Sequence, residues 1–307
     1  MSVDVGEVLK NKAINGWRLF WLITGPISIA IIIGMLGVDL SSGEGVSSMI
    51  QLSVRCAVPW LYLAFAAPSI QVLFPGTLSR WLLRNRKIMG LCFAAAMAWQ
   101  LLFILWLVTV YSDYYVDEVY VLRDVIEGVL GYLFLIAMTL TSFRFARKHL
   151  QPRQWKLLHK SGIYFLWAYA FSVYWWNLFY YPEPSWLDHV FYWSGFLACG
   201  LRIAAWRKKR RRLAEQGASQ SRPYPALMIL GLVLVMLGLA AAASDLIWRA
   251  PAEALLTGHA ITRVPELYLP YYPPTPYLPL LFIALGAFFT TNSATARPPN
   301  SAVIRPD

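Results

Sequence analysis

The feature that most constrains this chain is a series of long apolar runs separated by short polar segments. They cover residues 17–37, 54–75, 88–111, 124–144, 158–180, 187–206, 224–248 and 277–292. A helix of roughly 20 apolar residues crosses a hydrocarbon layer about 30 Å thick. Because lipid offers no hydrogen-bond partners, each run must satisfy its own backbone, which predicts helices. We therefore expect an all-α integral membrane protein, a bundle of about eight transmembrane helices.

Composition excludes the other broad classes. Of the 307 residues, 58% are apolar and only 14% are charged, and the mean hydropathy is +0.50. These values exclude a disordered chain, a coiled coil and an ordinary soluble domain. Cys56, Cys92 and Cys199 lie in or beside apolar runs without metal-ligand spacing. We expect them to be small buried side chains, and we expect no metal site.

The net charge of +11 would suggest a nucleic-acid partner in a soluble chain. Here, however, the charged residues are distributed according to the loops in which they lie. If successive loops alternate sides, all but four of the 27 basic residues fall on one side, and all but four of the 16 acidic residues fall on the other. This is the positive-inside pattern. It predicts a multi-pass protein of a bacterial-type inner (cytoplasmic) membrane, with both termini cytoplasmic and no nucleic-acid partner.

Runs and charges together divide the chain into five segments. They are a cytoplasmic N-terminal segment (1–16), a six-helix membrane core (17–206), a polybasic cytoplasmic loop (207–223), two further transmembrane helices with a Pro/Tyr-rich outer loop (224–292), and a cytoplasmic tail (293–307).

Two polar segments indicate partners. The basic stretch Arg207–Arg212 is expected to lie on anionic lipid headgroups, at about 1 kcal/mol per basic residue; docking of an acidic partner is the alternative. The outer loop 249–276 is rich in proline and tyrosine, which suits an extended interfacial segment better than a helix. It is either a surface cover or a contact for another membrane or periplasmic protein.

Ionisable side chains near the ends of the runs form a predicted outer charge cluster. Charged groups inside a membrane are costly and indicate function by default. One interpretation is a structural network of charges that holds the bundle together. The other is a functional one, a proton or cation entry site. No carboxylates occupy the middle of the runs, which argues against a proton-coupled transporter. The members of the cluster are Arg55, Arg123, Asp124, Glu127 and Asp245.

Two stretches resemble the ferric reductase-like transmembrane superfamily, in particular the haem-binding membrane subunit of the bacterial methionine sulfoxide reductase system. They are LLRNRKIMGLCFAAAMAWQLLFI (82–104) and LTSFRFARKHLQPRQWKLLHKSGIY (140–164). The resemblance implies a six-helix ferric reductase-like core formed by the first six runs. The two C-terminal helices would be an addition.

The resemblance also implies where haem ligands would lie, since histidine pairs on facing helices hold b-type haem in that family. The third-helix positions fall at Gln100 and Met97, and the fifth-helix positions at His159 and Ser172. Only His159 is a histidine, so Met97, Gln100 and Ser172 are vacated ligand positions. We expect no cofactor. The alternative is one residual haem b at His159.

In that alternative, Arg86 and Lys87 would lie opposite His159 and pair with haem propionates. From composition alone, His159 is an interfacial hydrogen-bonding residue.

Three functions follow from these interpretations. The preferred one is a haem-depleted accessory, assembly or sensory subunit with no catalytic residues. The alternative is a membrane electron-transfer component, an oxidoreductase subunit. The third, a transporter, rests only on the number of spans.

Overall fold

The computed structural model describes residues 5–217, 225–257 and 270–292, and every regular element in them is helical. The long helices are α2 (Gly16–Leu36), α3 (Gly43–Leu73), α5 (Arg86–Val110), α7 (Leu122–Thr141), α9 (Pro152–Phe179), α10 (Trp186–Gly217), α11 (Pro225–Ala243) and α14 (Leu278–Asn292). Each predicted apolar run falls on one of them. The all-α prediction is therefore confirmed for the described residues.

Short helical elements connect the long helices. They are α1 (Val5–Val8), η1 (Lys12–Ile14), α4 (Thr77–Arg84), α6 (Ser112–Tyr114), η2 (Tyr115–Val119), α8 (Arg144–Arg147), α12 (Arg249–Thr257) and η4 (Thr275–Tyr277).

Among the described residues, five helices are long and apolar enough to cross a membrane: α2, α3, α5, α7 and α11. The predicted number of eight spans therefore stays a prediction. Helices α9 and α10 are also long, at 28 and 32 residues, but their tyrosines, tryptophans and charged residues lower their hydropathy. Helix α14 has only 15 residues. The outward faces of the apolar helices agree with lipid contact, since Leu36 is 84% exposed and Met236 is 65% exposed. Soluble proteins rarely expose such surface.

Several predicted boundaries are wrong. Helix α3 begins at Gly43, well before residue 54, because Ser42 caps it by accepting a hydrogen bond from the Gly45 N–H at 3.1 Å. Helix α9 begins at Pro152, because a proline in the first turn has no N–H to lose.

The segment predicted as a polybasic loop (207–223) continues α10 as far as Gly217. Its basic side chains carry long alkyl stems that cost a helix little, and the Lys208 Nζ donates to the Leu73 carbonyl at 3.0 Å. Residues 218–224 lie outside the described part.

The Pro/Tyr-rich loop is not extended throughout. Residues Arg249–Thr257 form α12, and Thr275–Tyr277 form the 3₁₀ turn η4. The alanines and leucines of α12 favour a helix, whereas the prediction weighed mainly the later prolines. Residues 258–269 and the predicted cytoplasmic tail 293–307 lie outside the described residues.

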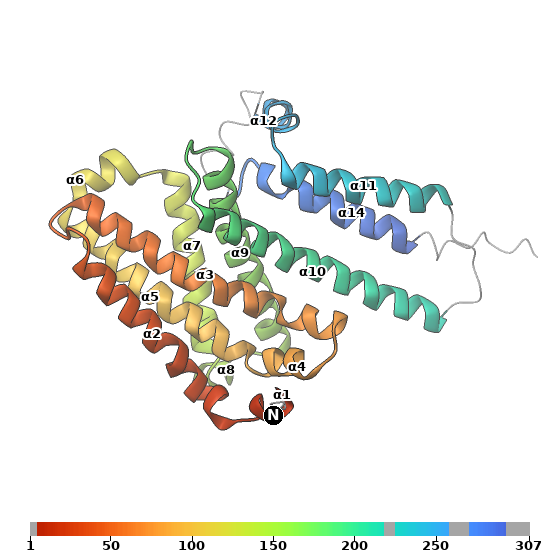
Figure 1. Ribbon diagram of the computed structural model, residues 1–307, viewed down its shortest axis with the longest axis horizontal. Coiled ribbons are helices and arrows are strands. Elements are labelled where there is room, and N and C mark those ends of the chain that lie inside the picture. Colours follow the sequence, from red (N-terminus) through yellow and green to blue (C-terminus); the bar gives the residue numbers. More distant parts are fainter. Residues whose placement is uncertain (1–4, 218–224, 258–269, 293–307) are drawn as a thin grey trace, which may run out of the picture.

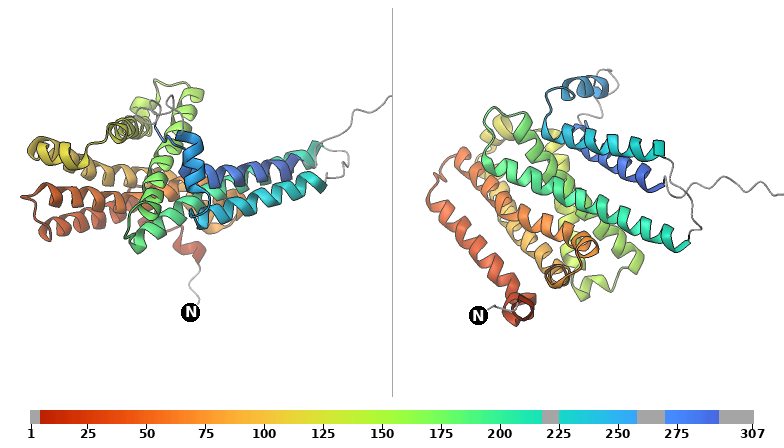
Figure 2. Two further views of the ribbon diagram at one scale, coloured as in Figure 1. Left: turned by 90° about the horizontal axis from the view of Figure 1, so that it is seen from above. Right: turned by 45° about the vertical axis from the view of Figure 1, so that its right-hand side comes forward.

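Successive long helices run in alternating directions (Figure 1). Helices α7 and α9 are inclined to α3, α5 and α10 (Figures 1 and 2). The hairpin of α11 and α14 lies on the side of α10 away from α3, and it packs on the rest through α14 and α10. Because α7 and α9 are antiparallel neighbours, the end of one lies beside the start of the other.

The core between α3, α9 and α10 is an aromatic stack. The Trp167 ring lies nearly parallel to Phe65 at 5.3 Å and to Phe171 at 5.2 Å, and Phe171 stacks on Tyr192 at 5.4 Å. Phe65, Phe171 and Tyr192 are fully buried. The Tyr192 hydroxyl donates to the Ala242 carbonyl of α11 at 2.9 Å, which ties the C-terminal hairpin to this core.

Small residues let α11 and α14 approach backbone to backbone. A Cβ atom at Gly231 would lie 2.7 Å from the Gly286 carbonyl oxygen, and one at Gly238 would lie 2.6 Å from the Pro279 carbonyl oxygen. Close approach at glycines is the usual packing of helices in lipid, where burial of apolar surface gives no driving force between them.

Candidate functional site

A cavity of about 620 Å³ opens where α7 ends and α9 begins. Helices α3, α5 and α10 complete its wall. We call it the basic cavity, because its charged lining residues are all cationic: Arg86, Lys87, Arg147, Lys156, Lys160 and Arg202. Its lining contains no aspartate or glutamate.

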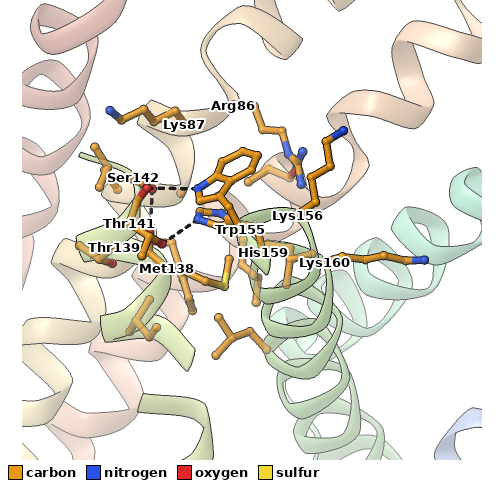
Figure 3. A pocket seen from close by; sticks show the side chains of 18 of the residues that line it. Arg86, Lys87, Met138, Thr139, Thr141, Ser142, Trp155, Lys156, His159 and Lys160 are labelled. Atoms are coloured by element: carbon orange, nitrogen blue, oxygen red, sulfur yellow. Dashed lines mark hydrogen bonds between the residues drawn. The ribbon is translucent and has the colours of Figure 1, made fainter. Parts of the chain in front are cut away.

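His159 lies in this cavity, one turn beyond Trp155 (Figure 3). The His159 Nε2 is 3.0 Å from the Thr141 hydroxyl oxygen at the end of α7. That hydroxyl donates its one hydrogen to the Ala137 carbonyl at 2.7 Å. In the tautomer with Nε2–H, this hydroxyl accepts the hydrogen bond from the imidazole, whose free lone pair is then on Nδ1.

Trp155 of α9 also contacts the end of α7. Its indole N–H donates to the Thr141 carbonyl at 3.1 Å, and its ring lies 4.5 Å from the His159 ring. The guanidinium of Arg147 lies over the indole, 4.5 Å from its centre. The two ends of the α7–α9 connection are thereby held together.

The cations are positioned by carbonyls and rings instead of carboxylates. The Arg86 Nε donates to the Ala64 carbonyl at 2.8 Å. The Arg202 Nε donates to the Phe65 carbonyl at 3.1 Å, and its guanidinium lies 3.9 Å from the Phe65 ring centre. Their positive charge is not neutralised within the lining, so the cavity favours an anion.

The deeper wall of the basic cavity is apolar. It is formed by Leu61, Phe93, Leu135, Ile163 and Leu166. A cationic rim above an apolar base matches a ligand with an anionic head and an apolar body.

The residues at the ligand positions that the resemblance implies make hydrogen bonds within the bundle. The Tyr132 hydroxyl of α7 lies 2.8 Å from the Gln100 Oε1 and 3.1 Å from the Met97 carbonyl. Ser172 is buried and donates to the Tyr169 carbonyl at 2.9 Å. Gln100 and Ser172, expected to face each other, thus have different partners.

The lining fits part of a haem only. Arg86 and Lys87 share the cavity with His159 and would suit propionates. The lining does not supply a pair of axial histidines, because His159 is its only histidine among the described residues and the His159 Nε2 is held by Thr141. Of the methionine, cysteine and tyrosine side chains that ligate haem iron in proteins, the described lining holds one, Met138. The bis-histidine arrangement does not fit these residues.

Among the described residues, the predicted outer charge cluster forms separate ion pairs, and Arg123 and Asp124 also act electrostatically on Glu127. Arg123 pairs with Asp124 at 3.2 Å, and Asp245 pairs with Arg249 at 2.6 Å. Glu127 is buried and accepts the N–H of Tyr271 at 2.8 Å. Arg55 is half-buried on α3 and acts electrostatically on Asp188 of α10.

Sequence reasoning missed four of the six cavity cations: Arg147, Lys156, Lys160 and Arg202. Lys156 lies within the motif W-K-L-L-H and Lys160 follows four residues later on the same helical face, so this signal was available for these two. Arg147 lies in α8, before the start of α9. Arg202 was not accessible to such reasoning, since it reaches Phe65 across 137 positions.

The fold and this cavity define an all-helical chain with helices fit to cross a membrane and a basic, anion-favouring site. Comparisons with protein-family models, with curated proteins and with solved structures found no match. The resemblance to ferric reductase-like proteins thus stays a prediction.

Proposed function

We propose that this chain is a multi-pass membrane protein whose basic cavity binds an amphipathic phosphate anion, an anionic phospholipid. In this proposal it is a haem-depleted relative of the ferric reductase-like proteins that serves as an accessory, assembly or sensory subunit. All eight long helices span the bilayer, with the basic cavity on the cytoplasmic side.

One observation carries the proposal: six basic side chains and no acidic one surround an opening whose base is apolar. Lysine and arginine bind phosphate through charge-assisted hydrogen bonds, and arginine can do so with two parallel bonds. An acyl chain would contact the apolar base. A volume of about 620 Å³ lies within the range of pockets for small amphipathic molecules.

The experiment is a binding titration with the full-length protein in zwitterionic nanodiscs. The probe is a fluorescent short-chain phosphatidic acid, and the matched control ligand carries the same chain without the phosphate. We expect saturable binding of the phosphate-bearing probe only. Inorganic phosphate as competitor distinguishes recognition of the headgroup alone from recognition of the whole amphiphile.

The variant pair is Lys156→Gln with Lys160→Gln. Both side chains are exposed, so their loss leaves the fold intact. At about 1 kcal/mol per basic residue, the double variant should bind about 30-fold more weakly. The control, Lys148→Gln with Arg153→Gln, removes the same charge outside the cavity lining. Equal weakening by both pairs would show general surface attraction and overturn the proposal.

The second candidate is a membrane electron-transfer component with one haem b at His159. The placing of Arg86 and Lys87 beside that imidazole favours it. Absorption spectra of the purified protein, oxidised and dithionite-reduced, separate the two functions. We expect no Soret band, and His159→Ala should leave the spectrum unchanged. A Soret band near one haem per chain, lost in His159→Ala, would establish the second candidate instead.

A further inference from the structure

A second cavity, of about 540 Å³, lies at the opposite ends of the same two helices, where α7 begins and α9 ends. Helix α12 and the segment from Tyr271 to Tyr277 complete its wall. We call it the aromatic cavity, because tyrosines and one tryptophan dominate the lining. Its rings come from Tyr169, Trp176, Tyr180, Tyr181, Tyr271, Tyr272 and Tyr277.

A buried carboxylate faces this cavity. Glu127 is only 5% exposed, and its Oε1 accepts the backbone N–H of Tyr271 at 2.8 Å. Within the described part of the chain, its Oε2 accepts no hydrogen bond. The one basic residue of the lining, Arg123, pairs with its neighbour Asp124 at 3.2 Å. Arg123 and Asp124 also act electrostatically on Glu127, but the hydrogen bonds leave its Oε2 open to a ligand.

Several hydrogen-bond donors of the lining are used inside the protein. The hydroxyls of Tyr271 and Tyr277 donate to backbone carbonyls of α9 at 2.8 and 2.9 Å. Ser172 donates to a carbonyl of its own helix, and the Asn177 amide donates to Asp188 at 3.0 Å. The lining thus holds three acidic residues (Asp124, Glu127 and Glu253) against one basic residue, together with the faces of aromatic rings.

From these groups we propose that the aromatic cavity binds an organic ammonium ion. Ring faces attract cations through their quadrupole, most strongly when water is excluded. A ring of this lining already holds a cation, since the Arg249 guanidinium lies 5.1 Å from the centre of Tyr180. The volume far exceeds that of a bare metal ion, and among the described residues no cluster of three metal-ligating side chains occurs.

The backbone of Tyr271 has an unusual conformation that allows its contact with Glu127. Tyr271 has a positive φ of 62°, a conformation that L-residues other than glycine adopt rarely. In that conformation its N–H reaches Glu127 while its ring packs 5.0 Å from Phe165. The carboxylate thus anchors the aromatic wall with one oxygen and offers the other to the cavity.

This site is separate from the basic cavity, so its test does not depend on the proposed function. The experiment is isothermal titration calorimetry with the full-length protein in nanodiscs at constant sodium chloride. The probe is choline, and the control ligand is its neutral carbon isostere, 3,3-dimethyl-1-butanol. We expect saturable binding of choline and at least about tenfold weaker binding of the isostere.

The decisive variant is Glu127→Gln, which keeps the Oε1 acceptor for Tyr271 but removes the charge. It should weaken choline binding about tenfold or more. The matched control is Glu118→Gln, an exposed carboxylate outside the cavity, which should bind like wild type. Trp176→Leu, which removes a ring face and leaves the carboxylate, should also weaken binding.

Three results would overturn the proposal: no saturable choline heat in the wild type, equal affinity for the neutral isostere, or wild-type affinity in both Glu127→Gln and Trp176→Leu. Circular dichroism of each variant shows whether it is folded, and if Glu127→Gln is not, Trp176→Leu decides the outcome.

Discussion

At the scale of single residues, the roles of side chains depend on partners distant in sequence. The resemblance implied that Arg86 and Lys87 lie opposite His159 in the haem alternative, and all three line the basic cavity. It did not show that Thr141, 18 positions earlier, holds the His159 Nε2. That contact decides which nitrogen is free, and it depends on how α7 packs on α9.

The turn between α2 and α3 permits a test of a single titrating group. Asp39 accepts a hydrogen bond from the Ser41 N–H at 2.9 Å and another from the Ser41 hydroxyl, and these hold the pKa of its carboxyl below the ordinary value. A carboxyl with a lowered folded pKa stabilises the turn above its unfolded pKa of about 4. That contribution is lost as the pH falls through the folded value.

We expect Ser41→Ala to return the pKa of Asp39 toward the ordinary carboxyl value. Carbon-13 NMR of the aspartate carboxyls measures it, with Ser47→Ala as the control on the neighbouring helix. An unchanged Asp39 pKa in Ser41→Ala would contradict the assigned cause.

At the scale of elements, hydrophobic runs located every long helix but not its ends. Helix ends depend on caps and on contacts beyond the apolar run, as Ser42 and the bond of Lys208 to α3 show. At the level where the resemblance implies haem ligands on α9, the structure has ordinary side-chain packing, in which Phe171 and Trp175 are fully buried. Apolar periodicity cannot reveal such contacts, because it records only which face is apolar.

The packing of α11 on α14 gives a prediction at this scale. Gly231→Ala places a methyl group 2.7 Å from the Gly286 carbonyl oxygen. Because that oxygen belongs to the backbone, it can move aside only at a considerable cost in free energy. We expect a loss of about 1–3 kcal/mol in the free energy of unfolding, measured as a lower thermal midpoint in detergent.

Gly200→Ala on α10 is the matched control, since a Cβ there meets nothing within 4 Å. It should leave the midpoint unchanged or raise it slightly, because alanine favours a helix over glycine. Equal midpoints for both variants would contradict the close packing of the hairpin.

At the scale of the whole molecule, the charge asymmetry of the loops and the two cavities agree. The basic cavity lies at the end that carries the excess of lysine and arginine, and the aromatic cavity lies at the other end of α7 and α9. The proposed topology therefore puts an anion site on the cytoplasmic face and a cation site on the outer face.

Cysteine labelling tests this sidedness. In a chain whose three native cysteines are replaced, Lys160→Cys marks the basic cavity and Tyr181→Cys marks the aromatic one; both positions are exposed. An impermeant maleimide added to intact cells, with the outer membrane opened, should label Tyr181→Cys only. Labelling of both, or of Lys160→Cys alone, would contradict the eight-span topology.

Native mass spectrometry of the protein released from its membrane tests the central claim most directly. The account predicts a retained anionic phospholipid on the wild-type chain, lost in Lys156→Gln with Lys160→Gln and kept in Lys148→Gln with Arg153→Gln. A bound mass equal to haem b, or retention of the same lipid by both variant pairs, would contradict it.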